Sequence, residues 1–321
     1  STLSSSSAAS DVYKRQDFYM RTSWFKALIL TSAFPVLASA HTASPYILPD
    51  VFDTSSANSV SFQSSITLEK FFVPSFNFKT NYVISTPSGQ QKNLAAAAAL
   101  KKFNVAEFDL NEDGTYRIRT QNATGNPSKY ALVDGRWLRV RANRMPMQNP
   151  NQANKSAETA KTEQRPAAPA NNQPPRFVSE DQLPKNAQVI EVTNHLIAES
   201  FVTKGKPSAI PAVSNKGFEV KLLSHPGELY AGEALKAQVL FDGKPVPNLE
   251  IDIFKGADSY DLNAQREQPH AKTNNKGEVE IKFEKTGIYL ITTAYPEANP
   301  DATKKPASDI YTYGLTVEVA E

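Results

Sequence analysis

Hydrophobic and polar residues alternate along much of the chain between residues 41 and 144, and this period of two predicts half-buried β-strands. The clearest alternating segments are residues 59–63, 116–120, 130–133 and 136–140. Asp134-Gly135 separates the last two segments and predicts a two-residue hairpin turn, because both residue types tolerate positive φ. One exception is expected at residues 92–102, where five consecutive alanines, with their high helix propensity, predict a short helix.

From residue 218 onward the alternation is more regular. Seven short segments have the pattern of strands: 218–223, 234–241, 249–254, 270–273, 278–283, 288–295 and 311–319. Asp242-Gly243 and Asn275-Lys276-Gly277 supply turn residues between them. Seven strands at this spacing predict an immunoglobulin-like sandwich. The expected fold class is therefore all-β, with two β-sandwich domains.

Composition places the domain boundaries. Residues 148–176 contain no Val, Ile, Leu, Met, Phe, Trp or Tyr, so this stretch cannot offset its ordering entropy by burial and is expected to be a disordered insertion. Strand patterns resume at 188–193 and 196–203, which completes a first domain over residues 41–203. Residues 204–217 are rich in Pro, Ser and Lys and predict a linker to a second domain, residues 218–321.

The first forty residues have the character of a targeting segment. Residues 20–40 contain the basic Arg21 and Lys26, then an apolar run, then Ala38-Ser39-Ala40, the small-residue pattern of a signal-peptidase site. The apolar run is about a dozen residues, short of the roughly 20 that span a bilayer. We expect cleavage after Ala40, no membrane span in the mature chain, and a periplasmic or secreted protein. Residues 1–19 are expected to be a mis-assigned start or a cloning remnant.

Composition also narrows the possible chemistry. The 321 residues include no cysteine, which excludes disulfides, thiolate nucleophiles and cysteine metal sites. The formal net charge is +2, without a basic run suited to nucleic acid, so no nucleic-acid partner is expected. There is no Gly-x-Ser-x-Gly motif, and none of the four histidines stands in a recognisable catalytic pattern. No catalytic residue is nominated, and a non-enzymatic role is expected.

Seven segments carry a resemblance to one family: residues 112–117, 133–137, 199–205, 224–233, 239–247, 273–277 and 286–290. In this order they resemble the bacterial domain of unknown function 4198 over nearly the whole chain after residue 40. The resemblance implies an exported β-rich protein. Some members are described as periplasmic components of nickel or cobalt uptake, so the partners it implies are outer-membrane or other envelope uptake proteins.

Two histidines are the candidate metal ligands. Cleavage after Ala40 would leave His41 first, and a terminal histidine can chelate through its α-amine and imidazole, a donor pair that suits copper and nickel. Many members of the resembled family also begin with histidine. His225 is the second candidate, within the family-like segment 224–233. A further histidine that is frequent in the family is replaced here by the stretch Thr293-Ala294-Tyr295. The expected cofactor is nickel, cobalt or copper, or otherwise none.

The sequence therefore predicts an exported periplasmic β protein that binds a transition metal or assists nickel or cobalt uptake. A metal-free envelope interaction module is one alternative, since β-sandwiches can present loops to a partner. A copper oxidase with an amino-terminal histidine brace is another. Most rings of the aromatic run at residues 71–78 are expected to pack in a core or on an edge strand, and a binding ridge on a loop is the alternative.

Overall fold

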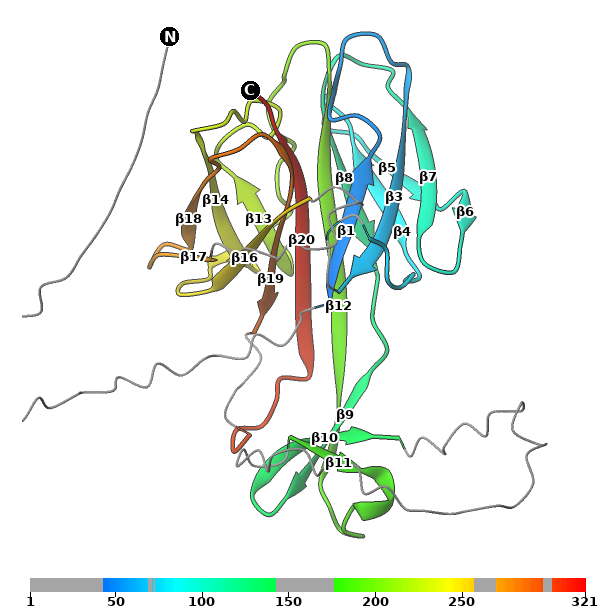
Figure 1. Cartoon of the computed structure of the whole chain (residues 1–321), viewed down its shortest axis with the longest axis vertical. Helices are drawn as coiled ribbons and strands as arrows, with labels where there is room; N and C mark the ends of the chain where they lie inside the picture. The colour runs from blue at the N-terminus through cyan, green and yellow to red at the C-terminus, as the bar shows by residue number, and fades with distance from the viewer. Residues whose placement is uncertain (1–42, 69–70, 72, 143–175, 257–269, 297–301) are drawn as a thin grey trace, which may run out of the picture. The chain divides into compact units, whose positions relative to one another are not determined.

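The computed structural model describes residues 43–68, 71, 73–142, 176–256, 270–296 and 302–321 (Figure 1). Within these residues the regular structure is β, apart from one 3-10 turn, η1 (Glu180–Gln182). The expectation of an all-β protein is confirmed. No helix among the described residues is long and apolar enough to cross a membrane.

The amino-terminal strands form two facing layers. One is an antiparallel sheet in the order β1 (Ser44–Pro49), β3 (Ser59–Thr67), β7 (Asn104–Asp109) and β6 (Ala98–Ala99). The other contains β4 (Asn81–Ser85), β5 (Gln91–Ala95) and β8 (Gly114–Gln121). Alternate side chains of both layers meet in a buried core that includes Phe62, Tyr82, Tyr116 and Ile118.

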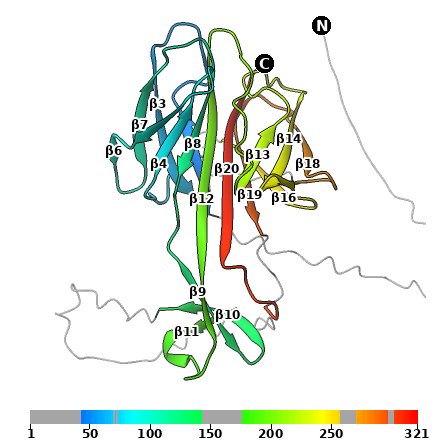
Figure 2. The same ribbon diagram turned by 180° about the vertical axis from the view of Figure 1, so that it is seen from behind.

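One long strand, β12 (Val189–Lys204), joins most of the described molecule. It pairs in turn with β9 (Ser128–Val133), β20 (Asp309–Val319), β8 and the short β2 (Asp53–Thr54). The pairing with β20 is parallel and runs from Thr193 to Ser200, so strands far apart in sequence lie side by side (Figures 1 and 2).

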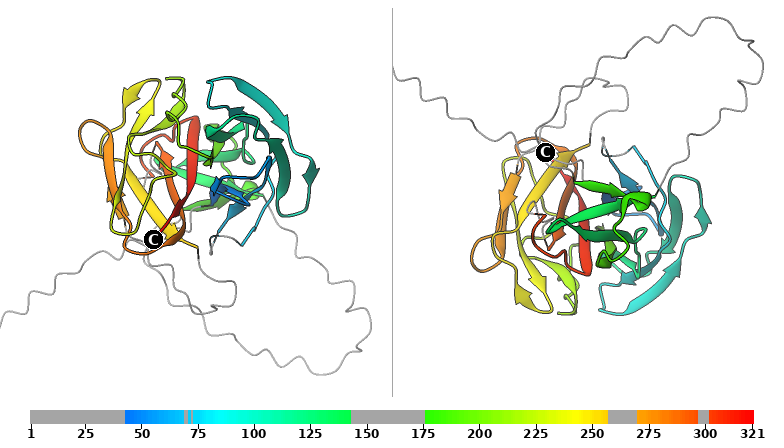
Figure 3. Two further views of the ribbon diagram at one scale, coloured as in Figure 1. Left: turned by 90° about the horizontal axis from the view of Figure 1, so that it is seen from above. Right: turned by 90° about the horizontal axis from the view of Figure 1, so that it is seen from below.

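The strands after residue 217 enclose the largest core. β20 continues the long sheet through β19 (Gly287–Tyr295), β16 (Glu250–Lys255) and β17 (His270–Lys272). A separate sheet contains β13 (Phe218–Leu222), β14 (Ala234–Phe241), β15 (Lys244–Pro245) and β18 (Glu278–Lys282). Their facing sides share one apolar cluster, and these strands lie on the opposite side of β12 and β20 from the amino-terminal ones (Figure 3).

β1 forms a second connection between the two groups of strands. It packs across β20 at Gly314, where the Cβ atom of any other residue would collide with the backbone carbonyl of Pro45. Tyr46 of β1 shares a buried cluster with Phe254 and Leu290, which belong to β16 and β19. A residue without a side chain is therefore needed at position 314, because it lets the two backbones approach closely.

Most sequence-predicted strands are present, and so is the hairpin between β9 and β10 (Arg136–Arg141). Its turn residues Asp134 and Gly135 have φ of 49° and 75°, the positive values that a two-residue turn requires. The third strand of this group, β11 (Phe177–Ser179), pairs in parallel with β10.

The predicted helix at residues 92–102 is wrong. This segment contains β5 and β6, which pair with β4 and β7. Its alanines are mostly exposed and offer no apolar face to bury, so intrinsic helix propensity yields to pairing with strands already in place. The two strands predicted at 188–193 and 196–203 are one continuous strand, β12.

Several sequence-based expectations lie outside the described residues. These are the segment before the expected signal peptide, the signal peptide itself, His41, and the expected disordered insertion apart from Arg176. The segment expected to be a linker is described, and we refer to residues 205–217 as the strap. Ser208 ties the strap to β8, since its Oγ accepts a hydrogen bond from the backbone N of Thr115 at 2.9 Å.

Candidate functional site: an arginine-lined pocket on β8 and β12

The alternation along β8 separates two kinds of side chain. Tyr116 and Ile118 point into the amino-terminal core, where both are almost completely buried. Successive side chains of a strand point to opposite faces, so Arg117 and Arg119 point the other way, toward β12 and the strap. A strand that serves the core on one face therefore presents two guanidinium groups on the other.

Glu199 of β12 receives both arginines. It lies between Ile197 and Phe201, which pack against the carboxy-terminal apolar cluster, and it is completely buried. Its carboxylate accepts hydrogen bonds from Arg117 Nε, from Arg119 Nη1 at 3.1 Å and from the Tyr313 hydroxyl at 2.9 Å. A carboxylate buried among apolar residues thus has three donors, which is the condition for keeping such a charge buried.

The protonation of this network follows from its geometry. Burial alone would raise the pKa of Glu199, but the charges of Arg117 and Arg119 and the hydrogen bonds outweigh it, so the pKa lies below its ordinary value. Burial and the neighbouring carboxylate raise the pKa of Tyr313 well above its ordinary value. At neutral pH the network therefore consists of one carboxylate, two guanidinium groups and a neutral tyrosine.

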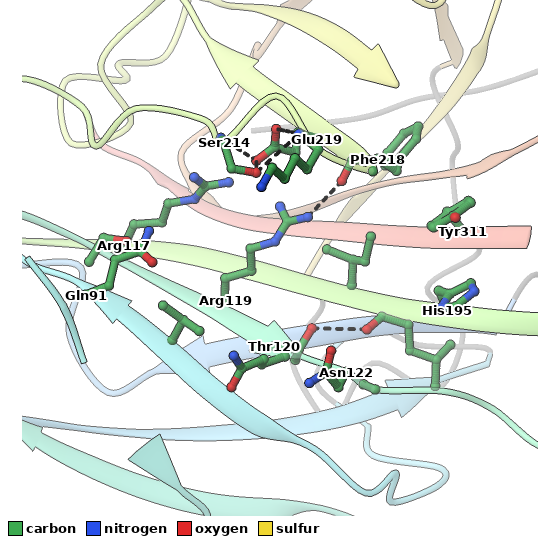
Figure 4. Close-up of a pocket in the computed structure, with 18 of the residues that line it drawn as sticks. Gln91, Arg117, Arg119, Thr120, Asn122, His195, Ser214, Phe218, Glu219 and Tyr311 are labelled. Atoms are coloured by element: carbon green, nitrogen blue, oxygen red, sulfur yellow. Dashed lines mark hydrogen bonds between the residues drawn. The ribbon is translucent and has the colours of Figure 1, made fainter. Parts of the chain in front are cut away.

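The guanidinium groups border a pocket of about 330 Å³ (Figure 4). Figure 4 shows both arginines rising from β8 toward the segment that carries Ser214 and Glu219. Arg119 Nη2 donates to the carbonyl of Phe218 at 2.7 Å, and Arg117 Nη1 donates to the carbonyl of Ala212 at 3.4 Å. The strap and the first residue of β13 thus close one side of the pocket by accepting hydrogen bonds from the two arginines.

The one acid in the described lining of the pocket is already paired. Glu219 is also buried, but its carboxylate already accepts from Ser214 N at 2.8 Å, Ser214 Oγ at 3.0 Å and Lys216 N at 3.3 Å. Arg117 is only 5% exposed. Its Nη2, by contrast with the Glu219 carboxylate, has no hydrogen-bond partner among the described residues. A second pocket, of about 450 Å³, shares Arg117 and Ala212 with the first. A buried donor without a partner is rare in folded proteins, so the guanidinium group of Arg117, a residue that lines this pocket, retains unused hydrogen-bonding capacity.

An aromatic column borders the same pocket at its other end. The ring of His195 stacks on Tyr311 with centroids 4.7 Å apart, and Tyr311 stacks in turn on Phe218 at 6.5 Å. His195 Nε2 lies 2.9 Å from Asp309 Oδ1. This hydrogen bond holds the imidazole in place beside the polar pocket wall.

His225, a sequence-predicted metal ligand, uses both ring nitrogens within the protein. Its Nδ1 accepts a hydrogen bond from Gly227 N at 3.1 Å, and its Nε2 lies 2.9 Å from Thr115 Oγ1. Since Nδ1 acts as the acceptor, Nε2 carries the proton and donates to Thr115. His225 thereby connects the carboxy-terminal strands to β8. Among the described residues, no group of three or more His, Asp or Glu side chains could hold a metal ion.

The family model for the domain of unknown function DUF4198 matches residues 38–297. This match covers most of the chain and confirms the resemblance drawn from the sequence segments. The chain belongs to the DUF4198 family. A search of curated proteins finds no match.

Solved structures with some likeness include adhesins. The D0-D1 domain of intimin is 10% identical, with a TM-score of 0.21, covering 87% of this chain and all of that one. A tetra-tandem repeat in the extending region of a large adhesion protein is 9% identical, with a TM-score of 0.21, and 87% and 49% of the two chains are covered. The Yersinia pseudotuberculosis adhesin InvE is 10% identical, with a TM-score of 0.19, and 86% and 58% are covered. TM-scores this low carry no argument about fold or function.

Sequence reasoning missed Arg117, Arg119 and Glu199 as site residues. A signal was present: Glu199 interrupts an apolar alternation in a predicted strand, and a buried acid in such a position needs a cationic partner. Arg117 and Glu199 also lie in two segments, 112–117 and 199–205, that carry the DUF4198 resemblance. A third segment, 224–233, supplies His225. The structure brings these three family-like segments together around Thr115 and Arg117.

Proposed function

We propose that this DUF4198 protein is an exported, non-enzymatic binding protein that holds a small anionic ligand in the pocket of Arg117 and Arg119. The observation that carries the proposal is the pair of guanidinium groups in the pocket lining: Arg117 and Arg119 share a single buried carboxylate, and Arg117 Nη2 has no partner among the described residues. The described lining carries Arg117, Arg119 and Lys216 against a single acid, Glu219. A carboxylate or phosphate oxygen is the acceptor that a guanidinium group binds best.

The size and the aromatic border of the pocket limit the chemical class of this ligand. A volume of about 330 Å³ lies at the small end of ligand sites, so it suits a ligand with one or two acidic groups rather than a polymer. The His195–Tyr311 stack offers apolar ring edges for the carbon skeleton of such a ligand. The proposal therefore favours small organic carboxylates. Inorganic phosphate, which has no carbon skeleton, is the simplest candidate.

The test is a set of thermal unfolding scans of the whole mature protein with acetate, succinate, citrate and phosphate, against chloride at matched ionic strength. Binding to the folded state raises the midpoint by an amount that grows with ligand concentration over Kd. We expect at least one anion to raise it more than chloride does. No anion-specific rise would overturn the proposal.

A matched pair of lysine variants locates the site. Lys216→Gln removes one positive charge from the pocket lining, and Lys236→Gln removes one from an exposed position on β14 outside it. We expect Lys216→Gln to weaken anion binding by about twofold to fivefold, in line with the loss of an exposed charge contact. Lys236→Gln should bind like the wild type, and equal weakening in both variants would indicate a non-specific charge effect.

The rest of the proposal concerns export and architecture. We infer that residues 20–40 are a signal peptide, that the mature protein begins at His41, and that it is periplasmic or secreted. We further infer that residues 218–321 form an immunoglobulin-like sandwich. This inference is supported by the two sheets that share one apolar core. Amino-terminal sequencing of exported protein tests the expected start, and finding Ser1 or Met20 there would contradict it.

Transition-metal binding is a second candidate, and it depends on His41. Ala43, two residues later, packs against a small apolar cluster that includes Leu196, the neighbour of His195. Two residues of extended chain reach about 7 Å, so a terminal chelate at His41 could recruit a side chain near this cluster. Calorimetric titration of nickel, cobalt and copper into mature protein, and into a variant with one extra residue before His41, decides this point. Equal binding by both proteins would exclude the amino-terminal chelate.

A further inference from the structure

Exposed apolar residues gather on two neighbouring loops of the amino-terminal strands. Among the described residues, seven large hydrophobic side chains are exposed, and three of them lie here: Val73 (46% exposed), Phe76 (54%) and Leu100 (48%). Val73 and Phe76 belong to the segment between β3 and β4, whereas Leu100 belongs to the turn between β6 and β7. We refer to Val73, Phe76 and Leu100 as the ridge.

Hydrogen bonds hold the two loops side by side. The buried Ser65 Oγ lies within hydrogen-bond distance of a carbonyl on each loop, 3.1 Å from that of Phe76 and 2.8 Å from that of Lys102. Asn77 Nδ2 donates to the carbonyl of Leu100 at 2.7 Å. These bonds place the loop of Phe76 beside the loop of Leu100, although the two residues are more than twenty positions apart in the sequence.

The ridge is held in its exposed position. Phe76 exchanges backbone hydrogen bonds with Ile66, and Phe71 and Phe78 on either side of it are buried. The segment is therefore anchored by two aromatic side chains while the one between them faces outward. A single exposed apolar side chain is common on protein surfaces, but several on adjoining loops form a patch, and such patches mark interaction sites.

The charged side chains that the structure describes on these two loops are all basic. Lys79, Lys101 and Lys102 are exposed on the same two loops, and residues 73–81 and 95–104 contain no Asp or Glu. The adjoining Glu69 and Lys70 carry opposite charges. An apolar centre with lysines only at its rim is complementary to an anionic lipid surface, where apolar side chains enter the boundary of the acyl chains and lysines meet phosphates.

We propose that the ridge docks this protein onto an anionic lipid bilayer, with Phe76 and Leu100 entering the headgroup region and Lys101 and Lys102 contacting lipid phosphates. This peripheral docking needs no membrane-spanning element. It is separate from the pocket of Arg117, which is built from β8, β12 and the strap. The two proposals can therefore fail independently.

The experiment is co-sedimentation of the whole mature protein with vesicles of phosphatidylcholine and phosphatidylglycerol (about 3:1), compared with pure phosphatidylcholine, at about 0.1 M salt. We expect binding to the anionic vesicles that decreases as salt is raised. The double variant Lys101→Gln/Lys102→Gln should lower partitioning by about tenfold or more. Absence of binding to the anionic vesicles would overturn the proposal and leave a protein as the partner that covers the ridge.

Two matched controls separate the ridge from general stickiness and from the pocket. Phe76→Ser should weaken vesicle binding, whereas Leu223→Ser, which changes a residue 50% exposed outside the ridge, should leave it unchanged. Lys216→Gln alters the pocket and should bind vesicles like the wild type. Equal losses in Phe76→Ser and Leu223→Ser would overturn the assignment to the ridge, as would loss of vesicle binding in Lys216→Gln.

Discussion

The carboxy-terminal core and the contact between β8 and β12 meet on one face of β12 but are built from opposite chemistry. The core is an apolar cluster, in which Ile251, Leu315 and Val317 are almost completely buried. The contact consists of two arginines around one buried glutamate, on the same face of β12 that presents Ile197 and Phe201 to the core. Apolar burial holds the carboxy-terminal strands together, whereas a buried ion pair attaches β8 of the amino-terminal strands to β12.

The two kinds of contact respond differently to substitution. Apolar cores tolerate exchanges that conserve volume and lose stability mainly when a cavity is left. A buried ion pair tolerates little, because removal of one partner leaves the other charge buried without compensation. The contact between β8 and β12 should therefore be the more sensitive of the two to changes that preserve shape.

The largest effect is expected for Glu199→Gln, which keeps the shape of the side chain and removes its charge. Arg117 and Arg119 would then lack an anion, at a cost of about 3–5 kcal/mol in the free energy of unfolding. Urea denaturation measures this cost. Glu191→Gln, at an exposed position on the same strand, is the control and should change stability by less than about 0.5 kcal/mol. A loss below about 1 kcal/mol for Glu199→Gln would show that the pair contributes little.

The second largest loss of stability is expected for Gly314→Ala, because this substitution places a methyl group against the carbonyl of Pro45 where β1 crosses β20. The expected loss is about 1–3 kcal/mol, typical of overpacking where backbone must move. Gly125→Ala is the matched control, since a side-chain carbon there would meet only ordinary contacts at 3.8 Å and beyond. Equal thermal midpoints for the two variants would mean that β1 does not approach β20 this closely.

Acid should weaken the contact between β8 and β12 in a way that depends on Glu199. Its pKa in the folded protein is lowered from the ordinary value of 4.5, so the folded state binds this proton less readily than the unfolded state. The stability that Glu199 contributes is therefore complete above its ordinary pKa and is lost as pH falls through the lowered one. The difference in unfolding free energy between the wild type and Glu199→Gln should shrink between pH 7 and about pH 3. A difference that stays constant over this range would contradict the ion-pair assignment.

The sequence predicted the apolar part of this comparison better than the charged part. Period-two alternation located the strands after residue 217 to within a few positions, and it is clearest in β14 and β18, which have one face in a core and one toward solvent. Asp134-Gly135 and Asp242-Gly243 were readable as hairpin turns from local φ preferences, and all four residues have positive φ.

Pairings across long sequence separations could not be predicted in the same way. Nothing in the local pattern states that β12 lies parallel to β20, or that Glu199 faces Arg117 across 82 positions. The alanines after Leu94 show that local propensity is also a weak guide. Their helix propensity is a fraction of a kcal/mol per residue, and strand pairing with β4 and β7 outweighs it. The pocket depends on such long-range pairings, so its residue types were visible in the sequence while their convergence was not.

The smallest effect is expected at His225, where a neutral hydrogen bond rather than a charge connects the same two groups of strands. Since its Nδ1 accepts from Gly227 and its Nε2 donates to Thr115, His225→Ala should cost about 1 kcal/mol. His270→Ala, at an imidazole that is 52% exposed, should cost less than about 0.5 kcal/mol. Nitrogen chemical shifts of the imidazole provide a direct second measurement, because they distinguish the Nε2–H tautomer from the Nδ1–H tautomer. The Nδ1–H tautomer, or a shift of the His225 resonances on addition of nickel, would show that this ring is available as a ligand and does not serve as a neutral link between the two groups of strands.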